Sequence, residues 1–127
     1  NLIVKSQNEL LIAGYLDDSI VSFIVDVAKK GTKVKAIFRH ITRPGNKKAF
    51  KILKSGGVEA RVNRECHARF IVSDDREAMV SSADLTRDSF YDHFEAGIVT
   101  SDKKTINKLR DFFYKMWDQS IEGYIKN

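Results

Sequence analysis

The sequence predicts an α/β domain in which helices pack on the faces of a mixed β-sheet. Short apolar or alternating runs, each long enough for one strand, recur between longer segments whose apolar residues follow the helical period. The chain has 127 residues, the size of one domain, and shows no internal repeat or low-complexity tract. We therefore expect one domain over residues 1–127. Because the chain begins with Asn1 rather than methionine, we also expect this domain to be excised from a longer chain.

The amino-terminal half predicts two consecutive strand–helix units. The first strand lies in "ELLIAGYL", and Asp17 or Asp18 can cap the helix "SIVSFIVDVAKK", which ends at Gly31. Four apolar residues are expected to share one face of this helix: Ile20, Phe23, Ile24 and Val27. The alternating "KVKAIF" predicts the second strand, and "RPGNKKAFKILKSGG" predicts a loop and then a helix to about Leu53, closed by two glycines.

The carboxyl-terminal half predicts four more strands and a long helix. A short strand in "VEARV" precedes a strand that begins at Cys66, and "EAMVSSA" follows it after a turn at Asp74–Asp75–Arg76. "EAGIVTS" predicts the last strand, and Asp102 is expected near the cap of the final helix. The apolar face of that helix is expected to contain Ile106, Leu109, Phe112, Phe113 and Met116 or Trp117.

Composition favours a cytoplasmic protein with a polyanionic partner. The apolar runs are too short to cross a bilayer, and the single cysteine permits no internal disulfide. The formal net charge is +5 and the pI is about 9.4. Positive charge concentrates between Lys29 and Lys54, a segment without Asp or Glu. This segment is either a pair of solvated helix faces or a nucleic-acid-binding surface, for which the candidate residues are Arg39, Arg43, Lys47, Lys48 and Lys51.

The strand predicted from Cys66 carries an unusual pair of polar residues. Alternation places His67 and Arg69 on one side of the strand and Ala68 and Phe70 on the other. An unpaired buried cation costs several kcal/mol, whereas a cation beside an imidazole suits the oxygens of a phosphate. The alternative is an edge strand whose polar residues face water. Three further polar residues lie near the ends of the next two strands, where they can converge with this pair: Ser82, Asp84 and Glu95.

The spacing of these residues resembles the signature of the phospholipase D superfamily. His67, Arg69 and Asp74 are spaced as the histidine, lysine and aspartate of that signature. "SSADLTRDSF" resembles the glycine-serine-any-asparagine segment of the family, and "EAGIVTSD" resembles the strand that carries its glutamate. Residues 9–38 also resemble the first strand-helix-strand of such domains. The resemblance therefore implies a phospholipase D-like sandwich over nearly the whole chain.

The resemblance also implies roles for the candidate residues. His67 would be the nucleophile or the acid that protonates the leaving group, Arg69 the phosphate-binding cation and Ser82 an oxygen-binding hydroxyl. Glu95 would orient a histidine through its second ring nitrogen. Asp74 is expected to be structural, because alternation turns it away from His67. This chemistry requires neither a metal nor another cofactor.

Family enzymes combine two copies of the motif in one active site, whereas this chain has one. Either two chains form a homodimer through the faces that carry His67, or the second copy lies in the excised part of a longer protein. Three residues also depart from the family pattern: Arg69 replaces lysine, Ser81 glycine and Asp84 asparagine. Arginine and lysine are not equivalent in a tight site, and Asp84 would place negative charge beside a phosphate unless Arg69 pairs with it.

Two functions therefore remain open. The first is a metal-independent phosphodiesterase that uses a histidine nucleophile in a dimeric site. Its substrate would be nucleic acid rather than phospholipid, because the chain is small, basic and without an evident amphipathic lipid-anchoring segment. The alternative is a catalytically degenerate module that serves dimerisation or nucleic-acid binding in a larger protein.

Overall fold

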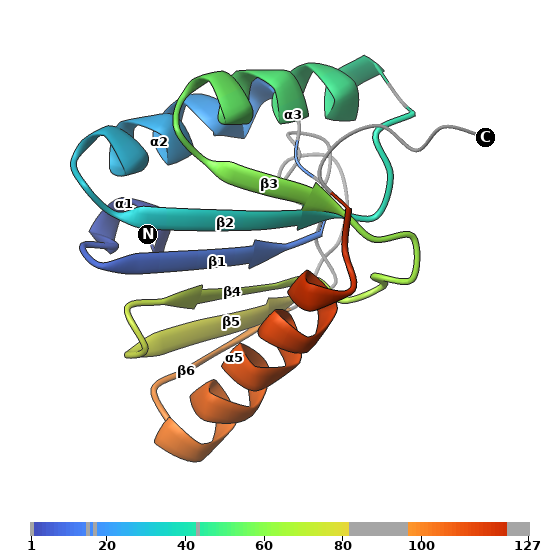
Figure 1. Cartoon of the computed structure of the whole chain (residues 1–127). Helices are drawn as coiled ribbons and strands as arrows, with labels where there is room; N and C mark the ends of the chain where they lie inside the picture. Colours follow the sequence, from blue (N-terminus) through green and yellow to red (C-terminus); the bar gives the residue numbers. More distant parts are fainter. Residues whose placement is uncertain (1, 15, 17, 43, 82–96, 122–127) are drawn as a thin grey trace.

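The computed structural model describes residues 2–14, 16, 18–42, 44–81 and 97–121. Within these residues the chain forms a six-stranded mixed sheet with the strand order β3-β2-β1-β4-β5-β6 (Figure 1). The strands are β1 (Glu9–Ala13), β2 (Lys33–Phe38), β3 (Glu59–Val62), β4 (Phe70–Ser73), β5 (Glu77–Ser81) and β6 (Gly97–Thr100). With helices on its faces, this sheet confirms the predicted α/β class.

Strand direction changes at β1, in the middle of the sheet. β1 pairs in parallel with β2, and β2 with β3, whereas the pairs β1–β4, β4–β5 and β5–β6 are antiparallel. The carboxyl ends of β1, β2, β3 and β5 therefore lie at the same edge of the sheet as the amino ends of β4 and β6. We call this edge the His67 edge, because the segment that contains His67 enters β4 there.

Helices cover both faces of the sheet, as Figure 1 shows. α2 and α3 lie on one face and α5 on the other, while the short α1 contacts α2 and β4. Their bounds are α1 (Leu2–Lys5), α2 (Asp18–Lys29), α3 (Pro44–Ser55) and α5 (Lys103–Asp118). The right-handed crossovers expected of parallel strands account for the shared face of α2 and α3, since α2 connects β1 to β2 and α3 connects β2 to β3.

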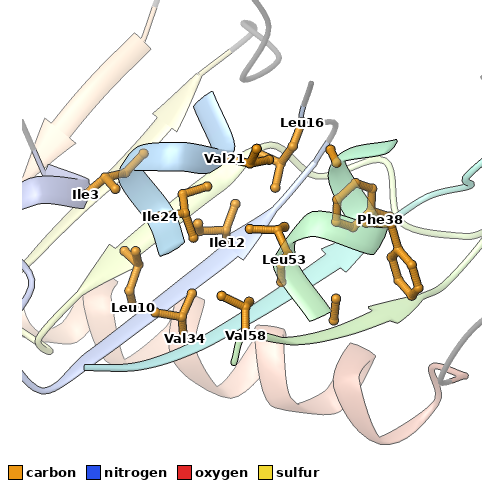
Figure 2. Packing of buried hydrophobic residues seen from close by; sticks show 14 of the residues in the cluster. Ile3, Leu10, Ile12, Leu16, Val21, Ile24, Val34, Phe38, Leu53 and Val58 are labelled. Carbon is orange, nitrogen blue, oxygen red and sulfur yellow. The ribbon is translucent and has the colours of Figure 1, made fainter. Parts of the chain in front are cut away.

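The larger apolar core lies between the sheet and the helices α2 and α3 (Figure 2). Ile24 of α2 and Leu53 of α3 are fully buried, and they pack in one cluster with Ile12, Val34 and Phe38 of the sheet. Full burial of such a side chain contributes about 1.5–3 kcal/mol. This cluster holds the parallel half of the sheet rigid beneath the segments that reach the His67 edge.

A second core lies beneath α5. Phe113 is fully buried, with its ring centroid 6.3 Å from that of Phe70 and 5.9 Å from that of Trp117. Leu11 and Val72, from adjacent strands, belong to the same cluster. Together these contacts fix α5 on the face opposite α2 and α3.

Polar contacts attach the same helix to β1. Glu9 accepts hydrogen bonds from Arg110 at 3.1 and 3.4 Å and from the Tyr114 hydroxyl at 2.7 Å. Lys35 donates to the same hydroxyl at 3.2 Å. Burial and the neighbouring Glu9 raise the pKa of Tyr114 to about 12, so the hydroxyl keeps its proton at neutral pH and continues to donate to Glu9.

The helix faces differ from the prediction at two positions. In α2, Phe23 is 51% exposed, and Val21 is buried beside Ile24 and Val27. In α5, Phe112 is 46% exposed, whereas Ile106, Phe113 and Trp117 are buried. Adjacent residues in a helix point about 100° apart, so a phenylalanine beside the centre of an apolar stripe turns out of the core.

Two element boundaries also differ from the prediction. The strand expected from Cys66 begins only at Phe70, and the first strand ends at Ala13 rather than at Leu16. The short helix α1 was not predicted. The second helix begins at Asp18 as its capping pattern suggests, while Asp17 lies outside the described residues. The predicted cap of α5 is confirmed, because the Asp102 carboxylate accepts a hydrogen bond from the Thr105 amide at 3.1 Å.

Asp74 joins the turn after β4 to the segment that enters β1. Its carboxylate accepts hydrogen bonds of 2.7–3.1 Å from the backbone amides of Gln7, Asn8 and Glu9. Burial alone would raise the pKa of Asp74, but these hydrogen bonds from the amides of residues 7–9 lower it below the ordinary 3.8. The charged carboxylate therefore stabilises the pairing of β1 with β4.

We expect Asp74→Asn to lower the free energy of unfolding by about 1–2 kcal/mol at neutral pH, since hydrogen bonds to a charged group are lost at a partly exposed site. Asparagine tolerates the positive φ of 55° at this position, so the change tests the charge rather than the backbone. Because the folded-state pKa is lowered, the stabilisation is present above about pH 4 and is lost as the pH falls through that pKa. Urea unfolding at neutral and acidic pH measures both effects.

Asp75→Asn is the matched control, because Asp75 lies in the same turn with a φ of 57° and its carboxylate pairs with the exposed Lys103 at 3.3 Å. An exposed pair of this kind contributes about 0–1 kcal/mol. Equal losses in the two variants, or a difference that does not shrink in acid, would show that the Asp74 carboxylate does not hold β1 to β4.

Candidate functional site

The segment between β3 and β4 brings His67 to the edge of the sheet. Asn63 donates its backbone N–H to the Phe38 carbonyl at 2.8 Å, and Cys66 donates to the Asn63 carbonyl at 3.0 Å. Cys66 is buried in the core beneath α5. Burial raises the pKa of its thiol, against a backbone hydrogen bond with Ala68 and the charge of Arg39, which lower it. The buried Cys66 anchors the segment immediately before His67.

The predicted alternation of this segment is confirmed where the core defines its two sides. Cys66, Ala68 and Phe70 belong to the cluster beneath α5, whereas Ile71 packs in the cluster beneath α2 and α3. His67 and Arg69 fall between the members of the first set, and both are exposed. An imidazole and a guanidinium are thus presented to solvent from one short extended segment.

Arg69 lies beside the end of β1. Its carbonyl accepts a hydrogen bond of 3.1 Å from the Ser81 amide, which extends the β4–β5 pairing by one residue toward His67. Gly14 follows β1 with a φ of 135°, and a Cβ added to it would lie 3.7 Å from the Arg69 Cγ. This distance is an ordinary van der Waals contact, so the φ of 135°, rather than a lack of space beside Arg69, is what favours glycine at this position.

The other residues predicted for catalysis lie outside the described residues. These are Ser82, Asp84 and Glu95, all within positions 82–96. The described residues on either side of these positions, Ser81 and Gly97, pair with each other across β5 and β6 at the His67 edge. The three predicted strand neighbours, β4, β5 and β6, are indeed adjacent and antiparallel.

Asp74 lies at the opposite edge of the sheet from His67. β4 separates the two residues, and its four residues span about 13 Å at the rise of a strand. The signature therefore combines, in one stretch of eight residues, a group at the candidate site and a group that fixes the far end of the same strand.

The predicted nucleic-acid-binding residues are distributed over two neighbouring segments. Lys47, Lys48 and Lys51 are exposed on α3, which begins near the His67 edge because β2 ends there. Arg39 lies directly after β2, and Arg43 is outside the described residues. The buried face of α3 consists of Asn46, Ala49, Phe50 and Leu53, so the lysines point away from the core.

One further feature of this edge was not predicted. Arg39, His40, Thr42 and Arg64 line a cavity of about 310 Å³, which we call the arginine pocket. The sequence shows Arg64 only as one isolated basic residue after a short strand. Its proximity to Arg39 follows from the parallel pairing of β2 and β3, which brings the residues after both strands together.

Among the described residues, no three His, Cys, Asp or Glu side chains are grouped so that they could hold a metal ion. In the same part of the chain, no helix has the length and apolar character needed to cross a membrane.

The fold and the family signature agree with comparisons to known proteins. A family model described as "Cardiolipin synthase, PLD-like domain" matches residues 1–117, so the chain belongs to the phospholipase D-like domain family. No curated protein matches the chain at a significant level.

Solved structures share the fold at low sequence identity. Nuc from Salmonella typhimurium, a phospholipase D family member, is 17% identical with a TM-score of 0.87, over 98% of this chain and 87% of its own. NucT from Helicobacter pylori is 20% identical with a TM-score of 0.84, over 96% of this chain and 86% of its own. TrmBL2, an archaeal chromatin protein with a novel mode of DNA binding, is 19% identical with a TM-score of 0.75, over 96% of this chain and 47% of its own.

We expect Gly14→Ala to lower the free energy of unfolding by about 1–3 kcal/mol, because an L side chain is strained at this φ. Relief of that strain moves the backbone beside Arg69, so the amide resonance of Ser81, which donates to the Arg69 carbonyl, should shift. Urea unfolding and amide chemical shifts measure the two effects.

Gly31→Ala is the control, since Gly31 has a φ of 103° but no atom within 4 Å of an added Cβ. It should lose comparable stability and leave the Ser81 amide unchanged. A similar Ser81 shift in both variants would show that Gly14 does not position Arg69.

Proposed function

We propose that the chain is a metal-independent phosphodiesterase of the phospholipase D-like superfamily that acts on nucleic acid. The observation that carries this proposal is the exposure of His67 and Arg69 together at the His67 edge of a phospholipase D-like domain. One relative in fold bears on the substrate, because TrmBL2 is an archaeal chromatin protein with a novel mode of DNA binding. The basic α3 surface next to the same edge supports a polyanionic substrate.

In the proposed mechanism, a neutral His67 imidazole nitrogen attacks the phosphorus and forms an N–P bond. The P–O bond to the leaving strand breaks, and the departing oxygen takes a proton from a second histidine on the opposite side. The second histidine, now neutral, takes a proton from a water molecule whose oxygen attacks the phosphorus, and the N–P bond breaks to release neutral His67 and the phosphate monoester. Arg69 and Ser82 would hold the non-bridging oxygens, and Glu95 would fix the tautomer of a histidine.

The second histidine is proposed to come from a second copy of the chain. One His67 cannot act on both sides of the same phosphorus, and a two-fold axis brings identical residues together. We therefore propose a homodimer through the faces that carry His67. A second domain of this kind in the same polypeptide would be the other source of this histidine.

A catalytically degenerate module is the second candidate function. The departures from the family pattern favour it, because Arg69 replaces lysine and Asp84 replaces asparagine. A pair between Arg69 and Asp84 would neutralise the phosphate-binding cation. Such a module would serve dimerisation or nucleic-acid binding within a larger protein.

We expect the protein to cleave a phosphodiester in excess EDTA, and His67→Ala to abolish this activity. The substitution removes the nucleophile and, through the second copy, the general acid, and the general acid alone contributes about 10²–10⁴-fold. His67 is exposed, so its loss should change stability by less than about 0.5 kcal/mol. DNA, RNA and a bis-aryl phosphate are the substrates, and thermal unfolding checks the fold.

Light scattering at high micromolar concentration determines whether the dimer forms. Arg69→Lys with Asp84→Asn restores the family residues and should leave activity equal or higher. A confirmed dimer that cleaves none of the three substrates would eliminate the phosphodiesterase and favour the degenerate module. Activity that survives His67→Ala would refute the proposed nucleophile.

We expect nucleic-acid binding to weaken steeply with salt, with a log–log slope of about −0.9 for each phosphate neutralised on duplex DNA. Reversing Lys47, Lys48 and Lys51 to Glu should weaken binding and flatten this slope, because these exposed lysines lie on the α3 surface. Fluorescence anisotropy over a range of salt concentrations measures both quantities.

The same reversal at Lys104, Lys108 and Lys115, exposed on α5, is the charge-matched control. It changes the net charge by the same amount on the other face of the sheet, and it should weaken nucleic-acid binding less than the α3 reversal does. Equal effects would show that net charge, rather than the α3 surface, governs binding.

A further inference from the structure

The arginine pocket has the chemistry of an anion site. Its lining residues, Arg39, His40, Thr42 and Arg64, carry two guanidinium groups, an imidazole and a hydroxyl, and none of its described lining residues carries a carboxylate. Its volume of about 310 Å³ is roughly ten times the share of one water molecule in the liquid. Guanidinium groups bind phosphate oxygens through two parallel N–H donors, so two arginines suit one phosphodiester group.

Backbone contacts hold the two sides of the arginine pocket in place. The Arg39 Nε donates to the Arg64 carbonyl at 3.4 Å, and Asn63 donates its N–H to the Phe38 carbonyl at 2.8 Å. On the other side of the pocket, the His40 Nδ1 and the Thr42 hydroxyl lie 2.9 Å apart. Arg39 thus uses Nε within the protein, while its terminal nitrogens make no hydrogen bond among the described residues.

The pocket is close to the candidate catalytic group along the chain. Arg64 precedes His67 by three residues, which span at most about 11 Å even when fully extended. A nucleic-acid strand advances about 3.4 Å of axis per phosphate. A strand with one phosphate at His67 therefore has its next one to three phosphates within about 11 Å of it, the upper limit of the backbone separation between Arg64 and His67.

We propose that the arginine pocket binds a phosphate of the nucleic-acid strand within three linkages of the one at His67. This inference rests on the proposed function for the nature of its ligand and extends it with a second contact point. Binding at two points fixes the direction of the strand across the His67 edge. Binding at two points also makes the site selective for nucleic acid over small phosphodiesters, which have no neighbouring phosphate for the pocket.

Binding of a labelled single-stranded oligonucleotide, measured by fluorescence anisotropy in EDTA, tests this proposal. The His67→Ala background prevents cleavage during the measurement. Arg39→Gln and Arg64→Gln should each weaken binding about tenfold, the effect of one lost hydrogen-bonded charge contact. Lys104→Gln with Lys108→Gln removes the same charge as the double arginine variant at a distance from the pocket and should change binding less than about twofold.

Neutral methylphosphonate linkages identify the phosphate. One methylphosphonate placed within three linkages of the central phosphate should weaken binding about tenfold when Arg39 and Arg64 are present. The same replacement should have no further effect on binding by the variant that lacks both arginines. With His67 present, the two arginine substitutions should reduce cleavage of the oligonucleotide more than hydrolysis of a bis-aryl phosphate, which has no neighbouring phosphate for the pocket. Thermal unfolding checks that each variant is folded. An Arg64→Lys variant keeps the positive charge and tests whether binding needs the two parallel donors of a guanidinium group.

Each contrary result overturns a defined part of the proposal. Binding by the double variant within twofold of the parent, or no binding by either protein at low salt, would eliminate the phosphate subsite. If inorganic phosphate displaces the oligonucleotide but no single methylphosphonate linkage weakens its binding, the pocket is assigned to free phosphate instead. A protein that binds through the two arginines but cleaves nothing would refute the phosphodiesterase while retaining the subsite.

Discussion

The antiparallel pairing of β1 with β4 is the constraint on which both the sheet and the candidate site depend. It joins the parallel half of the sheet to the antiparallel half, with Ala13 opposite Phe70 and Leu10 opposite Ser73. Asp74 holds the far end of this pair through three backbone amides. A slip of one residue would move every β4 side chain to the other face and exchange the buried residues with the positions that continue to His67. Asp74, at one end of β4, thereby helps to determine the position of His67, which precedes the other end.

The two faces of the sheet are held by different kinds of interaction. Beneath α2 and α3 the contacts are almost entirely aliphatic. Beneath α5, aliphatic side chains pack with the buried aromatic rings of Phe70, Phe113 and Trp117. Polar groups lie at the rim of this cluster: the Arg61 guanidinium lies 4.3 Å from the centre of the Trp117 ring, and Arg110 pairs with Glu9. Such planar cation contacts stabilise a partly exposed helix without requiring it to be buried. The Arg61 contact attaches α5 to β3, and the Arg110 contact attaches it to β1, which Gly14 follows at its other end.

Periodicity in the sequence was sufficient for the fold but not for all of the site. Alternation and capping residues predicted the order of the main elements, and the family signature identified His67 and Arg69, because both kinds of signal are local. Periodicity misplaced Phe23 and Phe112, since hydrophobicity alone does not decide which residue at the border of a stripe is buried. The arginine pocket could not be predicted, because Arg39 and Arg64 meet only through the parallel pairing of β2 and β3, which no short stretch of sequence encodes.

Arg69 is compatible with its surroundings even though the family pattern has lysine at this position. The longer guanidinium side chain begins beside Gly14, where an added Cβ would already lie 3.7 Å from its Cγ. That distance is an ordinary van der Waals contact, and glycine is favoured there by its φ of 135° rather than by the size of the neighbouring side chain. Arg69 is exposed and keeps the positive charge of the lysine in the family pattern. The departure from lysine then does not by itself indicate a lost phosphate-binding function, and the charge at Asp84 becomes the more informative difference.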